Sequence, residues 1–303
     1  MSTIFRPMLA ATVRKLEDLE FPLMGMPKYD GIRCIVQRSN VLSRTLKPIP
    51  NDYIRDKLQE LGCVNATTLW DGEIIIPGRP FNEVASAVMS KDGFSDFIYV
   101  VFDRVDKMDI PYSQRYKSLQ SVEEPSFRSF FGIAHVTAAP MQILHDFDEL
   151  ASYEEKVLSQ GYEGIILRSP TSVYKFGRST MREQGLMKYK RTEDAEGIVV
   201  GKEQLMHNDN SPTINNFGHT ERTSHQDSLS ESGMLGSLLV RAINGAYAGQ
   251  TFKVSCSPLT LKEKIKYWHE NLPSELVTFT YAKYRTGVNS PLEPRLKSFK
   301  LDV

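Results

Sequence analysis

The sequence predicts an α+β protein of two domains, and three observations lead to this prediction. The chain has 303 residues, which is long enough for two domains with separate cores. Short apolar runs with strand character alternate with a few amphipathic segments in the first two thirds of the chain. Near residues 190–196 this organisation changes, and a second series of strand-like runs begins. We therefore expect domains at 1–192 and 193–303.

The first domain combines strands with a small number of helices. Apolar and aromatic runs predict strands at 31–38, 40–42, 69–76, 97–103, 165–168 and 186–190. Ile54, Leu58 and Leu61 share one face of a predicted helix at 51–61, which Gly62 can end. A second amphipathic helix is expected at 146–160.

The second domain is predicted to be a small barrel. Strands are expected at 196–201, 236–242, 251–256 and 276–284, and Ser257-Pro258 is expected to open a helix that runs through Trp268. Five or so strands with one helix in about 110 residues fit an OB-fold, which often binds nucleic acid. Residues 203–233 are polar and predict a long flexible loop. We favour this loop over a metal site for its histidines, His207, His219 and His225.

Composition excludes several classes of protein. The chain is 41% hydrophobic and 24% charged, as in an ordinary soluble globular protein, and its net charge is zero. Nucleic acid would therefore be held by local patches rather than by a global field. We expect no membrane span, since no apolar run reaches the ~20 residues that a span needs. We also expect no signal peptide, since residues 1–7 contain no apolar h-region. Cys34, Cys63 and Cys256 lack metal spacing and fit a reducing cytoplasm.

One hexapeptide, residues 28–33, places a possible nucleophile beside several charges. Its sequence is Lys-Tyr-Asp-Gly-Ile-Arg, and it lies between an apolar segment and a predicted strand. We expect Lys28 at a strand-to-strand turn on the rim of a sheet. A lysine attacks only as the neutral amine, which desolvation or nearby cations favour. The alternative is a surface lysine in a turn.

Other charged residues also stand at strand ends. Asp71 and Glu73, in Asp-Gly-Glu, interrupt an apolar strand where a carboxylate needs a partner, a metal or a ligand hydroxyl, unless this is a surface turn. Glu163 opens another strand. Lys188 and Lys190 have period-2 spacing and would share a face, either around an anion or as guards of an edge strand. Together with Lys28 they predict one cleft suited to a polyphosphate and its divalent metal.

The order of these motifs resembles the covalent nucleotidyltransferase superfamily, which contains ATP-dependent DNA ligases, RNA ligases and mRNA capping enzymes. The resemblance covers about residues 5–302, and the compact size together with residues 174–178 makes the chain most similar to short bacteriophage DNA ligases. It implies an adenylation domain built on antiparallel sheets, followed by the OB-fold barrel. The matching segments are 28–33, 43–44, 71–73, 102–103, 163–168 and 188–190.

The resemblance implies a role for the residues around the reacting phosphate. Lys28 would attack the α-phosphorus of ATP and carry AMP. Glu163 would hold Mg²⁺ or Mn²⁺, and Lys188 and Lys190 would neutralise the α-phosphate. Arg178 would bind an outer phosphate. Such a site catalyses mainly by positioning and charge neutralisation.

The resemblance also implies contacts to the rest of the nucleotide. Arg33 would bind a phosphate of the nucleotide or of the nicked strand. Arg44 and Glu73 would contact the ribose side. Phe102 would stack on adenine, although an aromatic residue in a strand is often simply part of the core.

The match departs from the family pattern at two places. Met26 stands where a glutamate is usual, so adenine would be read there by backbone groups. Tyr29, which follows Lys28, is expected to contact the nucleotide as well. Lys300 stands where an arginine is usual in the last segment, so the pyrophosphate contact could fall to Arg295 or Lys300. A solvated basic tail is the alternative for this segment.

The resemblance therefore implies an ATP-dependent DNA ligase that uses ATP and Mg²⁺ or Mn²⁺. Its partner would be nicked double-stranded DNA, and it would act as a monomer in the cytoplasm without a membrane. The alternatives are an RNA ligase, a GTP-using capping enzyme, or a non-catalytic nucleic-acid-binding protein on the same fold. An NAD-dependent ligase is disfavoured because the sequence lacks a cysteine-rich zinc segment.

Overall fold

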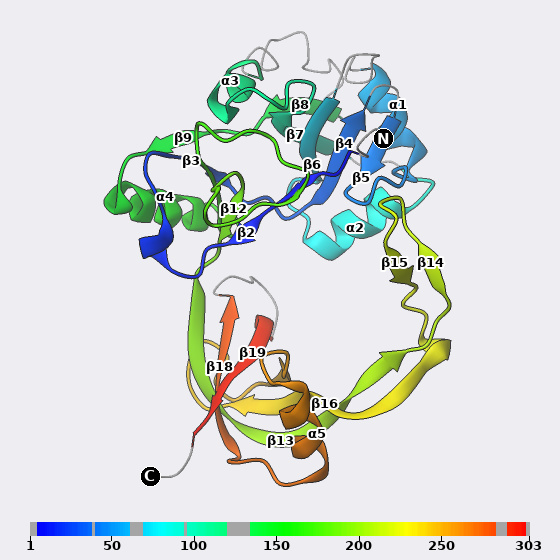
Figure 1. Ribbon diagram of the computed structural model, residues 1–303, viewed down its shortest axis with the longest axis vertical. Helices are drawn as coiled ribbons and strands as arrows, with labels where there is room; N and C mark the ends of the chain where they lie inside the picture. The colour runs from blue at the N-terminus through cyan, green and yellow to red at the C-terminus, as the bar shows by residue number, and fades with distance from the viewer. Residues whose placement is uncertain are drawn as a thin grey trace. The chain divides into compact units, whose positions relative to one another are not determined.

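The computed structural model describes residues 5–37, 40–60, 69–93, 96–119, 134–282 and 290–300. The chain forms two compact units, one of Met1–Tyr189 with Asn216–Gly218 and one of Lys190–Asn215 with His219–Val303. The first unit holds two five-stranded sheets, and the second holds a five-stranded barrel (Figure 1). Every helix among the described residues is too short or too polar to cross a membrane.

The first sheet of the first unit has the strand order β2-β12-β10-β3-β9. These strands are Ala11–Thr12, Met187–Tyr189, Ile165–Arg168, Leu23–Pro27 and Gln142–Leu144. β10 runs antiparallel to both β3 and β12, whereas β2 runs parallel to β12. Helix α4 (Phe147–Ser159) packs on β3 and β9 and starts at Asp146, whose side chain accepts from the Glu149 N–H. The helix predicted at 146–160 is thus confirmed.

The second sheet has the order β5-β4-β6-β7-β8. Its strands are Asn40–Ser43, Ile32–Gln37, Leu69–Ile75, Phe97–Arg104 and Ala134–Ala138, and the helices of this half are α1 (Asp52–Glu60), α2 (Phe81–Met89) and α3 (Tyr112–Lys117). Buried residues of α1 and α2, such as Leu58 and Val88, share one core with the sheet. The expected end of α1 at Gly62 lies outside the described residues.

The sheets of the first unit are mixed, which corrects the expected antiparallel architecture. β8 runs parallel to β7, and a parallel neighbour requires a crossover, here through a connection that includes α3. Strands β1 (Met8–Leu9) and β11 (Gly177–Arg178) form a further short parallel pair. Strand direction depends on these connections, and the apolar pattern that predicts a strand carries no information about it.

The second unit is a ring of strands in the order β13-β16-β17-β19-β18. These strands are Thr192–Asn208, Leu229–Ala242, Thr251–Ser255, Leu292–Phe299 and Leu276–Ala282. β13 pairs with both β16 and β18, and β17 meets β19 through one residue pair, Ser255 with Arg295. Buried residues such as Leu238, Val254 and Phe279 fill the interior.

Helix α5 (Leu261–His269) starts later than predicted. Thr260 caps it, because its hydroxyl accepts from the Glu263 N–H while the Glu263 carboxylate accepts from the Thr260 N–H. This reciprocal pair outweighs the Ser257-Pro258 start signal. At the other end, the Lys202 ammonium donates to the carbonyls of Tyr267 at 2.8 Å and Glu270 at 2.6 Å, which places a cation at the negative end of the helix.

Strands replace the long loop expected at 203–233. β13 continues to Asn208, β14 (Pro212–Ile214) pairs with β15 (Thr220–Arg222) in a hairpin, and β16 begins at Leu229 after the short 3₁₀ helix Gln226–Ser228. Most residues of β14 and β15 are exposed. A hairpin without a buried face shows no apolar alternation, so its sequence resembles that of a loop.

Candidate active site

Lys28 lies in the turn between β3 and β4, as predicted. Its backbone N–H donates to the Gly164 carbonyl at 2.8 Å. Its ammonium forms an ion pair with the carboxylate of Glu163, which precedes Gly164 in the sequence. Both side chains are mostly buried, with 23% of Lys28 and 12% of Glu163 exposed. A lysine attacks as the neutral amine, so this ion pair has to open before any reaction at nitrogen.

Gly31 is required by the close approach of two strands. A Cβ atom at this position would lie 2.3 Å from the Ile74 carbonyl oxygen of β6. Because a backbone atom cannot move aside as a flexible side chain can, only glycine lets β4 begin against β6 at this point. The glycine of the Lys-x-Asp-Gly motif thus allows the turn that carries Lys28 to lie directly against the second sheet.

A cavity of about 300 Å³ adjoins Lys28, and nearly all the predicted site residues line it. The lining residues are Leu9, Ala10, Met26, Pro27, Lys28, Tyr29, Arg33, Arg44, Glu73, Phe102, Ile166, Arg178, Leu186 and Lys188. Of the predicted set, Glu163 is absent from this lining but contacts Lys28, and Lys190 belongs to the second unit. Sequence reasoning missed the other lining residues, which are Leu9, Ala10, Pro27, Ile166 and Leu186, because apolar residues carry no chemical signal of their own.

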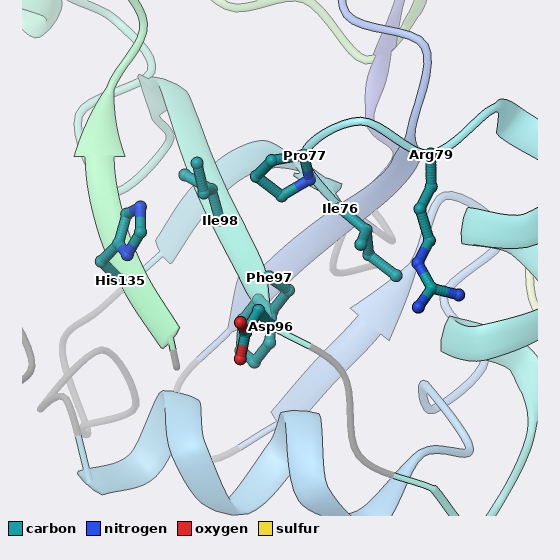
Figure 2. Close-up of a pocket in the computed structure, with 7 residues that line it drawn as sticks. All are labelled: Ile76, Pro77, Arg79, Asp96, Phe97, Ile98 and His135. Atoms are coloured by element: carbon teal, nitrogen blue, oxygen red, sulfur yellow. The ribbon is translucent and has the colours of Figure 1, made fainter. Parts of the chain in front are cut away.

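A second hollow, of about 330 Å³, lies beside the end of β6 and the start of β7 and β8 (Figure 2). Its lining residues are Ile76, Pro77, Arg79, Asp96, Phe97, Ile98 and His135. None of the predicted site residues is among them. Arg79 and Asp96 are exposed, and Arg79 lies 3.6 Å from the Glu83 carboxylate. The chemistry-bearing residues therefore gather at the first cavity.

The apolar wall of the first cavity comes from Met26, Phe102 and Ile166. Met26 and Phe102 are buried, and Ile166 packs against the cluster that they form. The Arg33 guanidinium carbon lies 5.2 Å from the centre of the Phe102 ring. Phe102 is thus both a core residue and a wall of the cavity, so the two interpretations of this aromatic residue are compatible.

The guanidinium of Arg33 is held by a buried carboxylate. Its Nε and Nη2 donate to the two Asp71 oxygens at 2.7 and 2.6 Å, and Nη2 also donates to the Met8 carbonyl at 2.9 Å. Burial alone would lower the pKa of Arg33, yet Asp71 raises that pKa above its ordinary value. The sequence indicated that Asp71 needs a partner, and the structure identifies Arg33.

Glu73 is the titratable carboxyl of the cavity. Burial raises its pKa from 4.5 to about 7, although the positive charges of Arg33 and Lys28 act in the opposite direction. Arg33 and Glu73 face each other across paired strands β4 and β6. A carboxyl group in this position can exchange its proton near neutral pH and can accept a hydrogen bond from a ligand hydroxyl.

A second buried carboxylate, that of Asp103, lies next in sequence to the lining residue Phe102. Asp103 follows Phe102 on β7, and its oxygens accept from Arg115 Nε at 2.8 Å and from Arg168 Nη2 at 2.6 Å. All three side chains are at most 1% exposed. Asp103 also faces Asp71 in the β6–β7 register. Each carboxylate therefore has its own arginine partners, which balance two adjacent buried charges.

The residues of the last segment lie in local ion pairs of the second unit. Lys300 pairs with Glu196 on β13, and Arg295 lies 3.2 Å from Glu293. Both basic side chains are exposed to solvent. Their expected role at pyrophosphate stays a prediction.

The side chains near Lys28 could bind a divalent ion only if a bound nucleotide supplied further oxygen atoms. No group of three or more His, Cys, Asp or Glu side chains converges within the described ranges. Mg²⁺ commonly takes one or two protein carboxylates and completes its shell with water and substrate phosphates. Glu163 fits that pattern when a nucleotide supplies the phosphate oxygens.

Comparisons with known proteins agree with the geometry. The family model of the ATP-dependent DNA ligase domain matches residues 7–190. The chain therefore belongs to the ATP-dependent DNA ligase family, which confirms the resemblance drawn from its motifs. Among solved structures, it is similar to Chlorella virus DNA ligase-adenylate, with 30% identity, a TM-score of 0.57 and 99% of each chain covered.

More distant relatives differ from the chain in length. A probable DNA ligase of Rhodococcus opacus (strain B4) is 28% identical over 219 residues, which are 65% of this chain and 40% of that protein. The DNA ligase of an African swine fever virus isolate from Kenya is 25% identical over 193 residues, or 45% of its length. The chain thus matches less than half the length of these curated relatives. A structure of Lig E DNA ligases shares the fold, with a TM-score of 0.69 at 21% identity.

Proposed function

We propose that this protein is an ATP-dependent DNA ligase that seals nicks in duplex DNA as a monomer. The observation that carries the proposal is Lys28, paired with Glu163 beside a cavity lined with cations and one aromatic face. In this proposal, residues 1–192 are the adenylation domain and residues 193–303 are an OB-fold domain that helps to hold nucleic acid.

The first proposed step charges the enzyme. The Lys28 amine loses a proton and attacks the α-phosphorus of ATP, so that an N–P bond forms and the bond to pyrophosphate breaks. Lys188, a lining residue, neutralises the α-phosphate, and Lys190 assists. Mg²⁺ or Mn²⁺ held by Glu163 and phosphate oxygens would neutralise further charge.

The proposed binding of the nucleoside uses both walls of the cavity. Adenine stacks on Phe102 beside Ile166, backbone groups next to Met26 read its edge, and Tyr29 closes the pocket. Arg44 and Glu73 line the same cavity and take the ribose side. Arg33 takes a phosphate with the part of its guanidinium that is not engaged by Asp71.

Two further steps complete the proposed reaction. A 5′-phosphate oxygen at the nick attacks the phosphorus of lysyl-AMP, which forms a P–O–P bond and releases Lys28. The 3′-hydroxyl then attacks the 5′-phosphorus, which forms the phosphodiester bond and releases AMP. Arg178, which lines the cavity and is exposed, binds an outer phosphate of ATP in the first step and contributes a phosphate contact to the nicked strand in these later steps.

Incubation with α-labelled ATP tests the first step. We expect the wild-type chain to carry an acid-labile label and Lys28→Ala to carry none, while Lys57→Ala, which removes a half-buried lysine of α1 outside the cavity, labels normally. Absence of label on the wild type, or undiminished label on Lys28→Ala, would refute the proposal.

A substrate comparison tests the later steps. We expect sealing of nicked DNA with ATP, and much less product with NAD, with GTP or on nicked RNA. Preferential sealing of nicked RNA would indicate an RNA ligase, and guanylylation with GTP would indicate a capping-type enzyme. Strong binding to nicked DNA with no sealing at any protein concentration would indicate a non-catalytic binding protein.

A further inference from the structure

The hydroxyl of Tyr174 lies behind the cavity wall and touches two other segments. Tyr174 is buried and donates to Asp71 Oδ2 at 2.7 Å, while its oxygen accepts from the Met8 backbone N–H at 2.9 Å. Burial, and then the neighbouring Asp71 charge, raises the pKa of Tyr174 well above its ordinary value. The phenol therefore stays protonated and keeps its role as a donor.

Tyr174 closes a loop of hydrogen bonds with the cavity arginine. Asp71 accepts from Tyr174 and, through both oxygens, from Arg33, and Arg33 donates back to the Met8 carbonyl. The loop joins β1, β4, β6 and the segment before β11. Without the hydroxyl, the buried Met8 N–H loses its partner and Asp71 loses one donor, so the arrangement around Arg33 is no longer fully satisfied.

The same ring of hydrogen bonds is connected to the part of the cavity that Leu9, Ala10 and Arg178 line. Met8 belongs to β1, which pairs in parallel with β11 so that Leu9 faces Arg178. The Arg178 side chain in turn donates to the Ala10 carbonyl at 2.7 Å. Leu9, Ala10, Arg33 and Arg178 all line the cavity, whereas Tyr174 does not. The Tyr174 hydroxyl is thus connected to Arg33 through Asp71, and to Arg178 through Met8 and the pairing of β1 with β11.

We propose that Tyr174 is a positioning residue for nick sealing: its hydroxyl fixes Asp71 and Met8, and thereby the separation of the Arg33 and Arg178 guanidinium groups. The proposal rests on the proposed ligase function. Tyr174 itself touches no substrate and acts through the two arginines, which need correct placement to meet phosphates in the transition state. The competing explanation is that Tyr174 only stabilises the core.

Tyr174→Phe separates the two explanations when rate and active fraction are measured independently. The matched control is Tyr99→Phe, which removes another buried hydroxyl. That hydroxyl donates to the Cys34 carbonyl at 3.1 Å, and neither residue lines the cavity. End-point labelling with α-labelled ATP counts the competent molecules. Single-turnover sealing by adenylated enzyme then gives a rate constant per competent molecule.

We expect Tyr174→Phe to lower this rate constant on the order of 10- to 100-fold, with the labelled fraction nearly unchanged, because a small misplacement of phosphate-binding groups is costly. Tyr99→Phe should keep the wild-type rate constant. If Tyr174→Phe lowered only the labelled fraction, or lost no more rate than the control, the positioning role would be wrong.

An NMR measurement judges the inference even if the chain proves not to ligate. In protein with ¹⁵N-arginine, the Arg33 Nε–H signal, assigned by its loss in Arg33→Lys, reports the pairing with Asp71. We expect its exchange with water to rise at least about tenfold in Tyr174→Phe and to stay unchanged in Tyr99→Phe. An unaltered signal in Tyr174→Phe would overturn the positioning role, whereas an unlabelled wild type would overturn only the ligase proposal.

Discussion

Replacement of Asp103 by asparagine provides a demanding test of the buried charges beneath the site. The change keeps the size of the side chain but leaves the guanidinium groups of Arg115 and Arg168 without their counter-charge, and neither arginine is exposed by more than 1%. Loss of one partner from a buried ion pair costs about 3–5 kcal/mol. This is a large part of the roughly 5–15 kcal/mol that stabilises a typical protein.

Urea unfolding can measure this loss in the first unit alone. The chain has two tryptophans, Trp70 on β6 of the first unit and Trp268 on α5 of the second, so a Trp268→Phe background leaves fluorescence from the first unit only. The control is Asp106→Asn, whose carboxylate forms a partly solvent-accessible pair with Arg104, with 23% of Asp106 and 29% of Arg104 exposed. We expect the control to cost less than about 1 kcal/mol.

The expected loss in Asp103→Asn also corresponds to a lower melting temperature, by about 6–20 °C for a unit of this size. A loss below about 1 kcal/mol, or one equal to that of Asp106→Asn, would show that the arginines find other partners or water. The inference that Asp103 balances two buried charges would then be wrong.

Two further predictions concern pH and the second unit. Because the folded state raises the pKa of Glu73 from 4.5 to about 7, this group favours folding below pH 4.5 and that contribution is lost as the pH rises to 7. Glu73→Gln should therefore gain stability relative to the wild type between pH 5 and 8, by up to about 3 kcal/mol and less if water reaches the partly buried carboxyl. Parallel stability curves for the two proteins, followed through Trp70, would contradict this. Lys202→Met keeps the apolar stem but removes the cation that binds the end of α5, and we expect the second unit to lose about 1–2 kcal/mol, measured by Trp268 fluorescence in a Trp70→Phe background. An unchanged unfolding midpoint would mean that water replaces the ammonium without loss.

Much of the first unit follows from local patterns. The strands at 32–37, 69–75 and 97–104 and the helix at 147–159 were predictable because a buried face imposes a period on the chain. The same logic located charged residues at strand ends, and most of these do meet at one cavity. Lys190 is an exception, since period-2 spacing places it beside Lys188, yet β12 ends at Tyr189.

Contacts between distant segments could not be predicted in this way. Tyr174 and Asp71 are separated by 103 positions, and no periodicity links a tyrosine before one strand to an aspartate within another. The sequence indicated only that a carboxylate in an apolar strand needs a partner. The choice among candidate partners depends on how β1, β4 and β6 pack in three dimensions.

The hairpin of β14 and β15 shows that a local element can also escape prediction from the sequence. Its residues are mostly exposed on both faces, so neither burial nor charge distinguishes it from an unstructured segment. Backbone pairing alone defines it, through Pro212 with Arg222 and Ile214 with Thr220. Sequence patterns detect the side chains that a fold buries, and this hairpin buries few.

The position of Lys28 at the end of β3 has a consequence for which changes to the chain the site would tolerate. The lysine and Glu163 stand at the ends of β3 and β10, which pair with Pro27 opposite Ile165. A strand rises about 3.3 Å per residue, so a slip of two positions would keep every side chain on its own face yet carry the amine roughly 7 Å from its carboxylate. Insertions in the connecting loops should therefore be tolerated far better than any change that alters this alignment of two backbones.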